Sequence, residues 1–457
     1  MSKKYLPLAG AVFCGLFICV HSVFAIVGTN VITIQSVMVA AGPGAAFAGT
    51  FDDLDNYFAY GASNPHSVVA ADVNGNGHVD LISANSGDDT LTVYTNDGSG
   101  NFVLASAPSL GGGRNPYAVV AADVNGDGKM DLISANNGNG TLTVYTNKSG
   151  GNFVLASTPT VGSQPWSVAA ADIKGDGKIA LISANRIGDS LTVLTNKGAG
   201  VFVFNATYTV GNYPRCVIAA DVNGDGYADL ISANYYDNTL TVLTNNRSGI
   251  FGYNATWSVD THPTCVIAAD VNGDGHVDLI SANLYYGTLS VLTNNGTGGF
   301  ALSSTLDVGS DPYSVTAADV NGDGYVDLIS ANGDGTLTVL TNDGSGGFVL
   351  ASTPYLGDTL ISITAADVNG DGGMDLICAN YDDSYLMVML NTELPSFLNG
   401  VAISWSTNAT GFVLQQNGDL TTTDWLDVSV TPTVTNKQKR VIIAPLVDNQ
   451  YYRLRHP

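Results

Sequence analysis

Residues 317–329 read AADVNGDGYVDLI, and this stretch or a close variant occurs seven times in the 457-residue chain. The copies follow one another at spacings of 48 to 51 residues. Their first aspartates are Asp72, Asp123, Asp172, Asp221, Asp270, Asp319 and Asp367. A regular period of this length is typical of a protein built from one repeated structural unit. The chain is therefore expected to contain seven copies of that unit.

Each unit contains four segments with the character of β-strands. In the sixth unit they are residues 314–320 (SVTAADV), 327–331 (DLISA), 336–341 (TLTVLT) and 347–352 (GFVLAS). The third segment alternates threonine with leucine or valine, which is the period of a strand. Four short strands in each repeat of this length are the signature of a propeller blade. The sequence therefore predicts an all-β fold, a seven-bladed β-propeller with four-stranded blades.

The seventh unit lacks a fourth strand, and the missing strand is expected near the start of the chain. Residues 385–390 supply the third strand, but no Gly-Gly-Phe segment follows them. Phe51 stands 14 residues before Pro65, as Phe102 stands 14 residues before Pro116. Residues near 47–61 are therefore expected to form the outer strand of the last blade, which would leave the ring without an open edge.

The remaining regions of the chain suggest export and a second module. A basic start at Lys3 and Lys4, an apolar run over residues 6–20 and a small-residue site ending at Ala25 predict a secretory signal peptide. The expected domains are a signal peptide at 1–25, a linker at 26–43, the propeller at 44–393, and a small sandwich-like β module at 394–457. No later segment is long and apolar enough to span a bilayer. A secreted or surface-exposed monomer is expected.

The acidic residues of the chain are almost all aspartates. There are 39 aspartates and one glutamate, Glu393, and the formal net charge is −24. Glutamate favours helices and aspartate favours turns, so a helical fold is not expected. A hydrophobic content of 45% excludes a disordered acidic chain. The charge also argues against a nucleic-acid partner, because phosphate binding needs clustered Lys and Arg.

The nine-residue loops of the repeats have the residue types that Ca²⁺ prefers. Positions 1, 3 and 5 offer side-chain oxygens, position 7 a backbone carbonyl and position 9 a carboxylate. The predicted ligands are Asp72, Asn74, Asn76, His78 and Asp80; Asp123, Asn125, Asp127, Lys129 and Asp131; Asp221, Asn223, Asp225, Tyr227 and Asp229; Asp270, Asn272, Asp274, His276 and Asp278; Asp319, Asn321, Asp323, Tyr325 and Asp327; Asp367, Asn369, Asp371, Gly373 and Asp375. The alternative is an acidic turn held by Asx hydrogen bonds alone. An EF-hand is excluded, because position 12 of the fourth loop is Ser232 and the flanking segments are strands.

The seven loops are not equivalent. Asn76 replaces the carboxylate at position 5 of the first loop, which is expected to weaken that site. In the third loop Lys174 stands at position 3 and Ala180 at position 9, so an ammonium group is expected to replace the ion beside Asp172 and Asp176. The sequence therefore predicts six calcium sites and one empty loop. Position 7 varies from histidine to glycine, which fits a backbone ligand and argues against catalytic or zinc-binding histidines.

The repeat resembles the FG-GAP or VCBS-type repeat of secreted and cell-surface proteins. The matching parts are the AADVNGDG-x-x-DLI run, the Thr-Leu-Thr-Val strand and the Gly-Gly-Phe strand, over about residues 47–391. The resemblance implies the fold of the integrin α-subunit head, a seven-bladed propeller with Ca²⁺ between the first and second strands. Such repeats occur in adhesion proteins, in lectin-like binders and beside catalytic domains. The tail is similar to small β modules at the carboxyl ends of exported bacterial proteins.

The loops opposite the calcium loops carry the candidate ligand-binding residues. Second-to-third-strand loops and blade-to-blade loops share one face of a propeller, here called the ligand face. Rigid aromatic side chains at loop tips suit stacking on a sugar or contact with a protein. The candidates are Trp166, Arg186, Arg215, Tyr235, Tyr236, Tyr285, Tyr286, Tyr313 and Tyr381, with His66, Tyr117 and His262 in the same loops. The alternative is that these rings only pack on neighbouring loops.

Cys216 and Cys265 occupy equivalent positions in adjacent units. A disulfide needs Cα atoms within about 7 Å, and equivalent positions of neighbouring blades are expected to lie farther apart. Free thiols are therefore predicted.

These patterns favour a calcium-stabilised binding or adhesion module that recognises glycan or protein ligands. The sequence contains no serine elbow, no His-Glu-x-x-His motif and no phosphate loop, so no catalytic residue is assigned. A calcium-dependent, lyase-like enzyme acting on polysaccharide is the alternative. A purely structural spacer is the third possibility.

Overall fold

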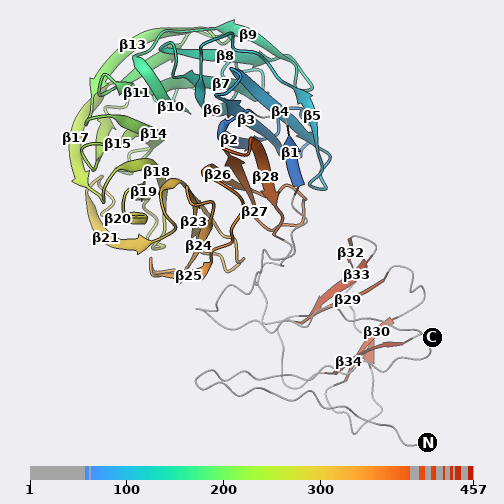
Figure 1. Cartoon of the computed structure of the whole chain (residues 1–457). Coiled ribbons are helices and arrows are strands. Elements are labelled where there is room, and N and C mark those ends of the chain that lie inside the picture. The colour runs from blue at the N-terminus through green and yellow to red at the C-terminus, as the bar shows by residue number, and fades with distance from the viewer. Residues whose placement is uncertain are drawn as a thin grey trace, which may run out of the picture. The chain divides into compact units, whose positions relative to one another are not determined.

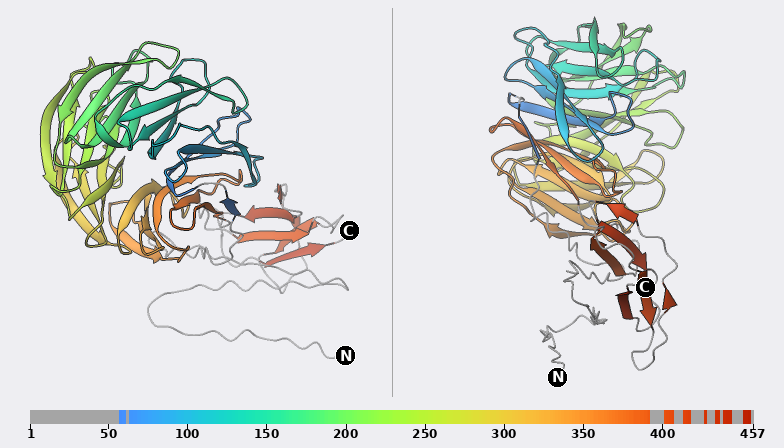
Figure 2. Two further views of the ribbon diagram at one scale, coloured as in Figure 1. Left: turned by 45° about the horizontal axis from the view of Figure 1, so that its top comes forward. Right: turned by 90° about the vertical axis from the view of Figure 1, so that its right-hand side faces the viewer.

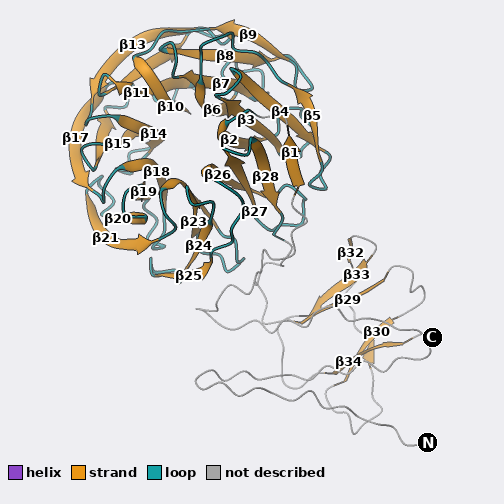
Figure 3. Cartoon of the chain, viewed as in Figure 1, coloured by secondary structure: helices purple, strands orange, loops and turns teal. Residues whose placement is uncertain are grey.

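The computed structural model describes residues 57–60, 63–391, 401–406, 413–417, 426–427, 433–435, 438–443 and 451–455. Within these ranges the regular elements are 34 β-strands and no helix (Figure 3). The same ranges therefore contain no helix that is long and apolar enough to cross a membrane. The predicted signal peptide, the predicted linker and Phe51 lie outside the described residues. The chain divides into two compact units, which are described separately.

The larger unit is a ring of seven blades, each a four-stranded antiparallel sheet (Figure 1). Blade 1 contains β2 (Pro65–Ala71), β3 (Asp80–Asn85), β4 (Thr90–Asn96) and β5 (Phe102–Ser106). Blade 2 contains β6 (Pro116–Ala122), β7 (Asp131–Asn136), β8 (Thr141–Asn147) and β9 (Phe153–Ser157). Blade 3 contains β10 (Ser163–Ala171), β11 (Ala180–Ile187), β12 (Ser190–Asn196) and β13 (Phe202–Thr209). Blade 4 contains β14 (Pro214–Ala220), β15 (Asp229–Asn234), β16 (Thr239–Asn245) and β17 (Phe251–Ser258).

Blades 5 to 7 repeat this arrangement. Blade 5 contains β18 (Pro263–Ala269), β19 (Asp278–Asn283), β20 (Thr288–Asn294) and β21 (Phe300–Asp307). Blade 6 contains β22 (Pro312–Ala318), β23 (Asp327–Asn332), β24 (Leu337–Asn342) and β25 (Phe348–Ser352). Blade 7 contains β26 (Leu360–Ala366), β27 (Asp375–Asn380), β28 (Tyr385–Met389) and β1 (Tyr57–Tyr60). Two further views show the blades standing around one axis (Figure 2). The predicted seven-bladed all-β fold is confirmed.

The two ends of the propeller sequence meet in blade 7, as expected. β1 pairs antiparallel with β28, with Tyr57 opposite Val388 and Tyr60 opposite Tyr385. The innermost strands β26 and β2 lie next to each other, which joins blade 7 to blade 1. The closing strand occupies four residues of the expected segment 47–61. The ring is therefore closed by a strand from the start of the chain.

The hydrophobic core lies between successive blades. All six residues of β15 are buried, and the interior of β16 is buried as well. Leu240 and Val242 of blade 4 pack in one cluster with Val266, Leu279 and Leu292 of blade 5. Similar clusters fill the other contacts between blades, including that of blade 7 with blade 1. Each blade therefore depends on its two neighbours to bury its apolar side chains.

An asparagine lies at the end of each third strand, or just after it in blade 7. Its side chain donates a hydrogen bond to a backbone carbonyl of the preceding blade. Asn245 Nδ2 donates to the Ile173 carbonyl oxygen of blade 3 at 2.8 Å and to the Ala228 carbonyl oxygen of its own blade at 3.0 Å. The seven donor–acceptor pairs are Asn96–Val368, Asn147–Val73, Asn196–Val124, Asn245–Ile173, Asn294–Val222, Asn342–Val271 and Asn391–Val320. Every acceptor is position 2 of a nine-residue loop. These asparagine latches tie each loop to the next blade.

The second unit contains two three-stranded sheets. One sheet has the order β29 (Val401–Ser406), β33 (Gln438–Ile443) and β32 (Thr433–Thr435). The other has the order β31 (Leu426–Asp427), β30 (Val413–Asn417) and β34 (Tyr451–Arg455).

Candidate calcium loops and ligand face

Each nine-residue loop folds around its first aspartate. In blade 4, Asp221 Oδ1 accepts a hydrogen bond from the Gly224 amide at 2.8 Å, and Oδ2 accepts one from the Gly226 amide at 2.7 Å. Both glycines have positive φ angles, of 74° and 85°, which glycine adopts without steric cost. Asn223 Oδ1 accepts from the Asp225 amide at 3.0 Å. The Asp-Val-Asn-Gly-Asp-Gly sequence therefore curls into one compact turn, with oxygen-bearing side chains at positions 1, 3 and 5.

The ninth aspartate joins the loop to the rest of its blade. Asp229 is fully buried, and its Oδ2 accepts from the Val222 amide at 3.2 Å, while Oδ1 accepts from the Asn245 amide at 2.7 Å. The other five loops that carry an aspartate at this position have the same pair of bonds. The position 9 carboxylate therefore supports the backbone of the loop and of the third strand.

The acidic groups of a loop act on one another electrostatically. Burial, with the nearby charges of Asp225 and Asp221, raises the pKa of Asp229 to about 6. The same causes raise the pKa of Asp327 and of Asp375 to about 7. Repulsion among acids at positions 1, 5 and 9 is the condition that a bound cation relieves.

The loops have the donor types for a hard cation, but their ninth carboxylates are engaged elsewhere. Across the residues that the structure describes, no three acidic, histidine or cysteine side chains converge as a metal cluster. The oxygens of positions 1, 3 and 5 and the carbonyl of position 7 suit Ca²⁺. The Asx hydrogen bonds of the alternative interpretation are also present. The residue types fit a calcium ion, and the turn also has hydrogen bonds of its own.

The third loop keeps the turn although it lacks two of the predicted ligands. Asp172 Oδ2 accepts from the Gly177 amide at 2.7 Å, and Asp176 Oδ1 accepts from the Lys178 amide at 3.0 Å. Ala180, which replaces the ninth aspartate, is buried at the start of β11. The shape of the turn therefore does not require the ninth carboxylate.

Three of the position 7 side chains cover a glycine of the loop between the third and fourth strands. A Cβ atom added to Gly98 would overlap the His78 ring, and one added to Gly344 would overlap the Tyr325 ring. The His276 ring stands over Gly296 in the same way. These contacts give the position 7 side chains a packing role, which agrees with the expectation that only their carbonyl groups could serve a cation.

On the opposite face, a β-bulge presents one side chain from every blade. The pairing of β10 with β11 shifts between Pro165 and Ser167, and that of β14 with β15 shifts between Pro214 and Cys216. The intervening residues of the seven first strands are His66, Tyr117, Trp166, Arg215, Thr264, Tyr313 and Ile361. Bulges commonly re-aim side chains near functional sites. The bulge in each first strand therefore places these seven side chains around the ring.

One group of aromatic rings runs across blades 7, 1, 2 and 3. The His66 ring stacks on Tyr117 at 4.0 Å, and Tyr381 meets His66 edge-on at 6.1 Å. Tyr117 in turn meets Trp166 edge-on at 4.6 Å. Burial lowers the pKa of His66 to about 4, so this histidine is neutral at physiological pH. The rings therefore form an uncharged aromatic row.

A second aromatic group belongs to blades 4 and 5. The Tyr235 ring stacks on His262 at 4.3 Å, and His262 meets Tyr285 edge-on at 5.7 Å. Tyr285 and Tyr286 meet at 5.0 Å. Tyr236, Tyr285 and Tyr286 remain 57%, 64% and 64% exposed. The packing of the alternative interpretation is thus present, and large ring surfaces still face solvent.

Two arginines connect the aromatic groups. The Arg186 guanidinium carbon lies 4.5 Å from the Trp166 ring centroid and 4.0 Å from that of Tyr213. The Arg215 guanidinium carbon lies 4.9 Å from the Trp166 centroid and 3.6 Å from that of Tyr235. We call Trp166, Arg186, Tyr213, Arg215, Tyr235, Tyr236, His262, Tyr285 and Tyr286 the ligand cluster. Of the other predicted residues, Tyr381 belongs to the first aromatic row. Burial raises the pKa of Tyr313, and the positive charge of the nearby Arg215 partly offsets this rise.

Tyr213 is a member of this cluster that the sequence interpretation missed. It precedes the first proline of its blade, where other blades have Asn64, Asn115, Gln164 and Asp311. Tyr213 and His262 both have a φ of 63° in this position, which is unusual for a bulky side chain. Asparagine and aspartate tolerate this conformation better. The replacement of a tolerant residue by an aromatic one was the available signal.

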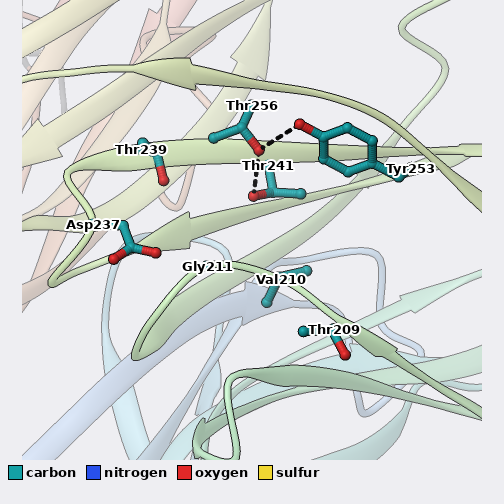
Figure 4. A pocket seen from close by; sticks show the side chains of 8 residues that line it. All are labelled: Thr209, Val210, Gly211, Asp237, Thr239, Thr241, Tyr253 and Thr256. Carbon is teal, nitrogen blue, oxygen red and sulfur yellow. Dashed lines mark hydrogen bonds between the residues drawn. The ribbon is translucent and has the colours of Figure 1, made fainter.

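A pocket of about 370 Å³ was also not predicted from the sequence (Figure 4). Some of the residues that line it are close in sequence to residues of the ligand cluster. It is lined by Thr209, Val210, Gly211, Asp237, Thr239, Thr241, Tyr253 and Thr256. The Tyr253 hydroxyl lies 3.3 Å from Thr256 Oγ1, which lies 3.1 Å from Thr241 Oγ1. Asp237 accepts two hydrogen bonds of 2.7 Å from Asn212. The wall of the pocket is therefore rich in hydroxyl groups.

The two half-buried cysteines are free and their thiols are in contact. A hydrogen bond with Cys265, together with burial, raises the pKa of the Cys216 thiol well above its usual value. Cys216 Sγ also lies 3.6 Å from the Val266 carbonyl oxygen of the next blade. The free state agrees with the free thiols predicted from the sequence. Inner strands of neighbouring blades run side by side, which brings equivalent side chains together.

Comparisons with known proteins agree with the repeat and the fold. A model of the FG-GAP-like repeat matches residues 72–134, 123–183, 174–232, 221–281, 270–330 and 319–378. No curated protein sequence matches the chain. Among solved structures, BBS1N in complex with ARL6DN is similar with a TM-score of 0.54 and 14% identity, covering 74% of this chain and 97% of that chain. A putative 6-phosphogluconolactonase from Bacteroides uniformis has a TM-score of 0.53 and 15% identity, covering 66% and 88%. Virginiamycin B lyase from Staphylococcus aureus has a TM-score of 0.52 and 12% identity, covering 73% and 99%. At these identities the likenesses concern the fold alone.

Proposed function

The chain belongs to the FG-GAP-like repeat family, and from this premise we propose that it is a calcium-stabilised binding module that acts outside the cell. Its ligands are glycans or proteins, held on the ligand cluster. A propeller of FG-GAP repeats fits a binding or structural module. The observation that carries the binding role is the exposure of Tyr236, Tyr285 and Tyr286 beside two arginines on a single face.

The composition of the cluster supports binding rather than a spacer role. Loops between the second and third strands are short and polar in blades 1, 2 and 6, where the positions equivalent to Arg186 and Tyr235 are Ser86, Asn137 and Gly333. Large side chains replace them in blades 3 and 4 although every blade has the same fold. A spacer does not need this asymmetry, whereas a binding face with aromatic and arginine anchors does.

Calcium is proposed as a stabilising cofactor at the loops of blades 1, 2, 4, 5, 6 and 7. The support is the oxygen-rich donor set and the mutual repulsion of the acids in each loop. The ion would neutralise charge in an acidic protein and fix the turn that each asparagine latch holds. The loop of blade 3 is proposed to remain without calcium because of Lys174 and Ala180.

The decisive experiment is a binding screen of the purified protein against glycans and extracellular proteins, with calcium and with chelator. A double variant, Tyr236→Ala and Tyr286→Ala, is expected to lose at least about tenfold in affinity for any ligand found, since exposed aromatic anchors dominate such interfaces. Tyr355→Ala is the matched control, because Tyr355 is equally exposed at 64% and lies outside the cluster.

Equal binding by the double variant and the wild-type protein would place the ligand elsewhere. Absence of any ligand would favour the spacer. Depolymerisation of an acidic polysaccharide by the wild-type protein, with loss of activity after chelation, would replace the binding role with the enzymatic alternative.

A further inference from the structure

The two arginines of the ligand cluster form no ion pair with any residue that the structure describes. The ion pairs in the described part of the chain are Lys129–Asp127 and Arg247–Asp225, and neither involves Arg186 or Arg215. Arg186 Nη1 has a weak hydrogen bond of 3.5 Å to Gln164 Oε1. The Nε atoms of both arginines are buried and have no protein acceptor within hydrogen-bonding distance.

Ring contacts alone do not use the full bonding capacity of these arginines. An aromatic ring attracts a guanidinium through the face of the ion. The five N–H groups of a guanidinium lie in its plane and need acceptors, which carboxylate and sulfate oxygens supply in pairs. The cluster therefore holds both cations in position while leaving donors available along their edges.

The charges of the two arginines also oppose each other. Burial lowers the pKa of Arg215, and the positive charge of Arg186 lowers it further. The chain has only 16 basic residues against 40 acidic ones, so a pair of neighbouring, partly desolvated cations is a local exception. A bound anion would relieve both the repulsion and the unpaired donors.

We propose that Arg186 and Arg215 together bind the anionic group, a carboxylate or a sulfate, of an acidic saccharide. The inference rests on the proposed binding function and names the class of ligand for the same cluster. The exposed rings of Tyr236, Tyr285 and Tyr286 offer faces on which a sugar ring stacks beside the anionic group.

The hydroxyl-lined pocket favours a saccharide over an acidic peptide. The hydroxyl-lined pocket is formed in part by Gly211 and Asp237, which are close in sequence to Tyr213 and Tyr236 of the cluster. A wall of threonine and tyrosine hydroxyls both donates and accepts hydrogen bonds, as sugar hydroxyls do.

The test is calorimetric titration of the full chain with four probes in calcium buffer at physiological salt. The probes are oligogalacturonate for the carboxylate, chondroitin sulfate for the sulfate, cello-oligosaccharide as a neutral sugar, and poly-glutamate as an acidic peptide. Binding is expected with one or both acidic saccharides, and the double variant Arg186→Gln and Arg215→Gln is expected to weaken it at least about tenfold. The Arg→Lys double variant is expected to retain part of the affinity.

Arg114→Gln is the matched control, since Arg114 lies in a blade-to-blade loop of the same face and bonds to Thr141. The affinity of this control variant should equal that of the wild-type protein. The circular dichroism spectrum and melting curve of every variant should also match those of the wild-type protein. Preference for the neutral sugar, or for poly-glutamate, would overturn the inference while leaving a binding module. Failure of all four probes, or acidic-sugar binding that the glutamine variant retains, would also overturn it. The ligand screen with Tyr236→Ala and Tyr286→Ala tests the proposed function separately.

Discussion

Asn96 of blade 1 donates a hydrogen bond of 2.7 Å from Nδ2 to the Val368 carbonyl oxygen of blade 7. The same bond is present at each of the six remaining contacts between successive blades. At this contact it joins blade 1 to blade 7, where the ring closes. Both groups are buried, so breaking the bond leaves a carbonyl without a partner. The latch therefore gives each contact between blades one directional bond in addition to its apolar cluster.

Removal of a latch is expected to destabilise the propeller measurably. Asn245→Ala leaves the Ile173 and Ala228 carbonyls without this donor, which should cost about 1–3 kcal/mol in the free energy of unfolding. Urea denaturation followed by far-ultraviolet circular dichroism provides the measurement. Asn101→Ala is the control, because Asn101 is exposed and bonds only to the exposed Asp97. A loss no larger than that of the control would contradict the latch.

The third loop should acquire a calcium site when its missing ligands are supplied. Lys174→Asn together with Ala180→Asp recreates the residue types of the other loops. The backbone amides of Ile173 and Asn196 stand at the positions that donate hydrogen bonds to the ninth aspartate in those loops. Calorimetric titration is expected to show one more bound ion per chain than the wild type. A site of millimolar or slightly tighter affinity would add about 1 kcal/mol of stability in millimolar calcium. An unchanged stoichiometry, with a folded variant, would count against the assignment of these positions.

Without calcium, stability is expected to fall as the pH rises from 5 to 8. The pKa values of Asp327 and Asp375 are raised to about 7 in the folded chain, against an ordinary value of 3.8. The folded state therefore binds more protons than the unfolded state in this range, and its advantage is lost as the pH passes the raised pKa values. Melting temperatures in chelator should show this fall.

Millimolar calcium should flatten the same pH profile, because the ion replaces the proton in offsetting the repulsion of the acids. Asp327→Asn should reduce the slope in chelator, since its amide does not titrate. A profile in chelator that rises with pH would show that these carboxylates are ionised and paired in the folded protein.

Cys216 and Cys265 should form a disulfide across blades 4 and 5 under oxidising conditions. Oxidised glutathione at pH 9 first forms a mixed disulfide with one thiol, and the second thiolate then displaces glutathione, so the protein loses two hydrogens overall. The hydrogen bond between the two thiols lowers the pKa of Cys265 and raises that of Cys216, so at pH 7 the mixed disulfide should form on Cys265 and its displacement by Cys216 should be the slow step. Intact-mass spectrometry distinguishes the products. Cys265→Ser is expected to stop at the mixed disulfide, and the same product from the wild type would show that the thiols cannot meet.

The repeat made most of the propeller predictable from the sequence. A fixed spacing of the Asp-Gly loops and one alternating Thr-Leu-Thr-Val segment define the blade, and the absent last strand points to the start of the chain. The asparagine latches were not predicted, because Asn245 looks like an ordinary turn residue and its partner Ile173 belongs to the previous repeat. Contacts between repeats depend on how blades stand side by side, which local patterns do not contain.

The contacts within the ligand cluster could not be predicted for the same reason, because they join residues of different blades. Trp166, Arg186 and Arg215 were singled out as loop residues, but their shared contact could not be read from spacing. Tyr213 was missed because an aromatic residue at this position is unusual only once the left-handed backbone of the position is known. The hydrogen bond from the third strand to the ninth aspartate was not predicted either, because the sequence motif of the loop does not include the residue that donates it.

The pairing of β1 with β28 has a consequence for biosynthesis. A ribosome releases β1 before any blade and completes β28 only after the other blades have been made, so the ring cannot close before β28 has been synthesised. A chain cut short before β28 would keep β1 without its partner and would present exposed strand edges to proteases and to other chains. An unpaired β1 therefore distinguishes a chain that stops before β28 from one that contains the whole propeller.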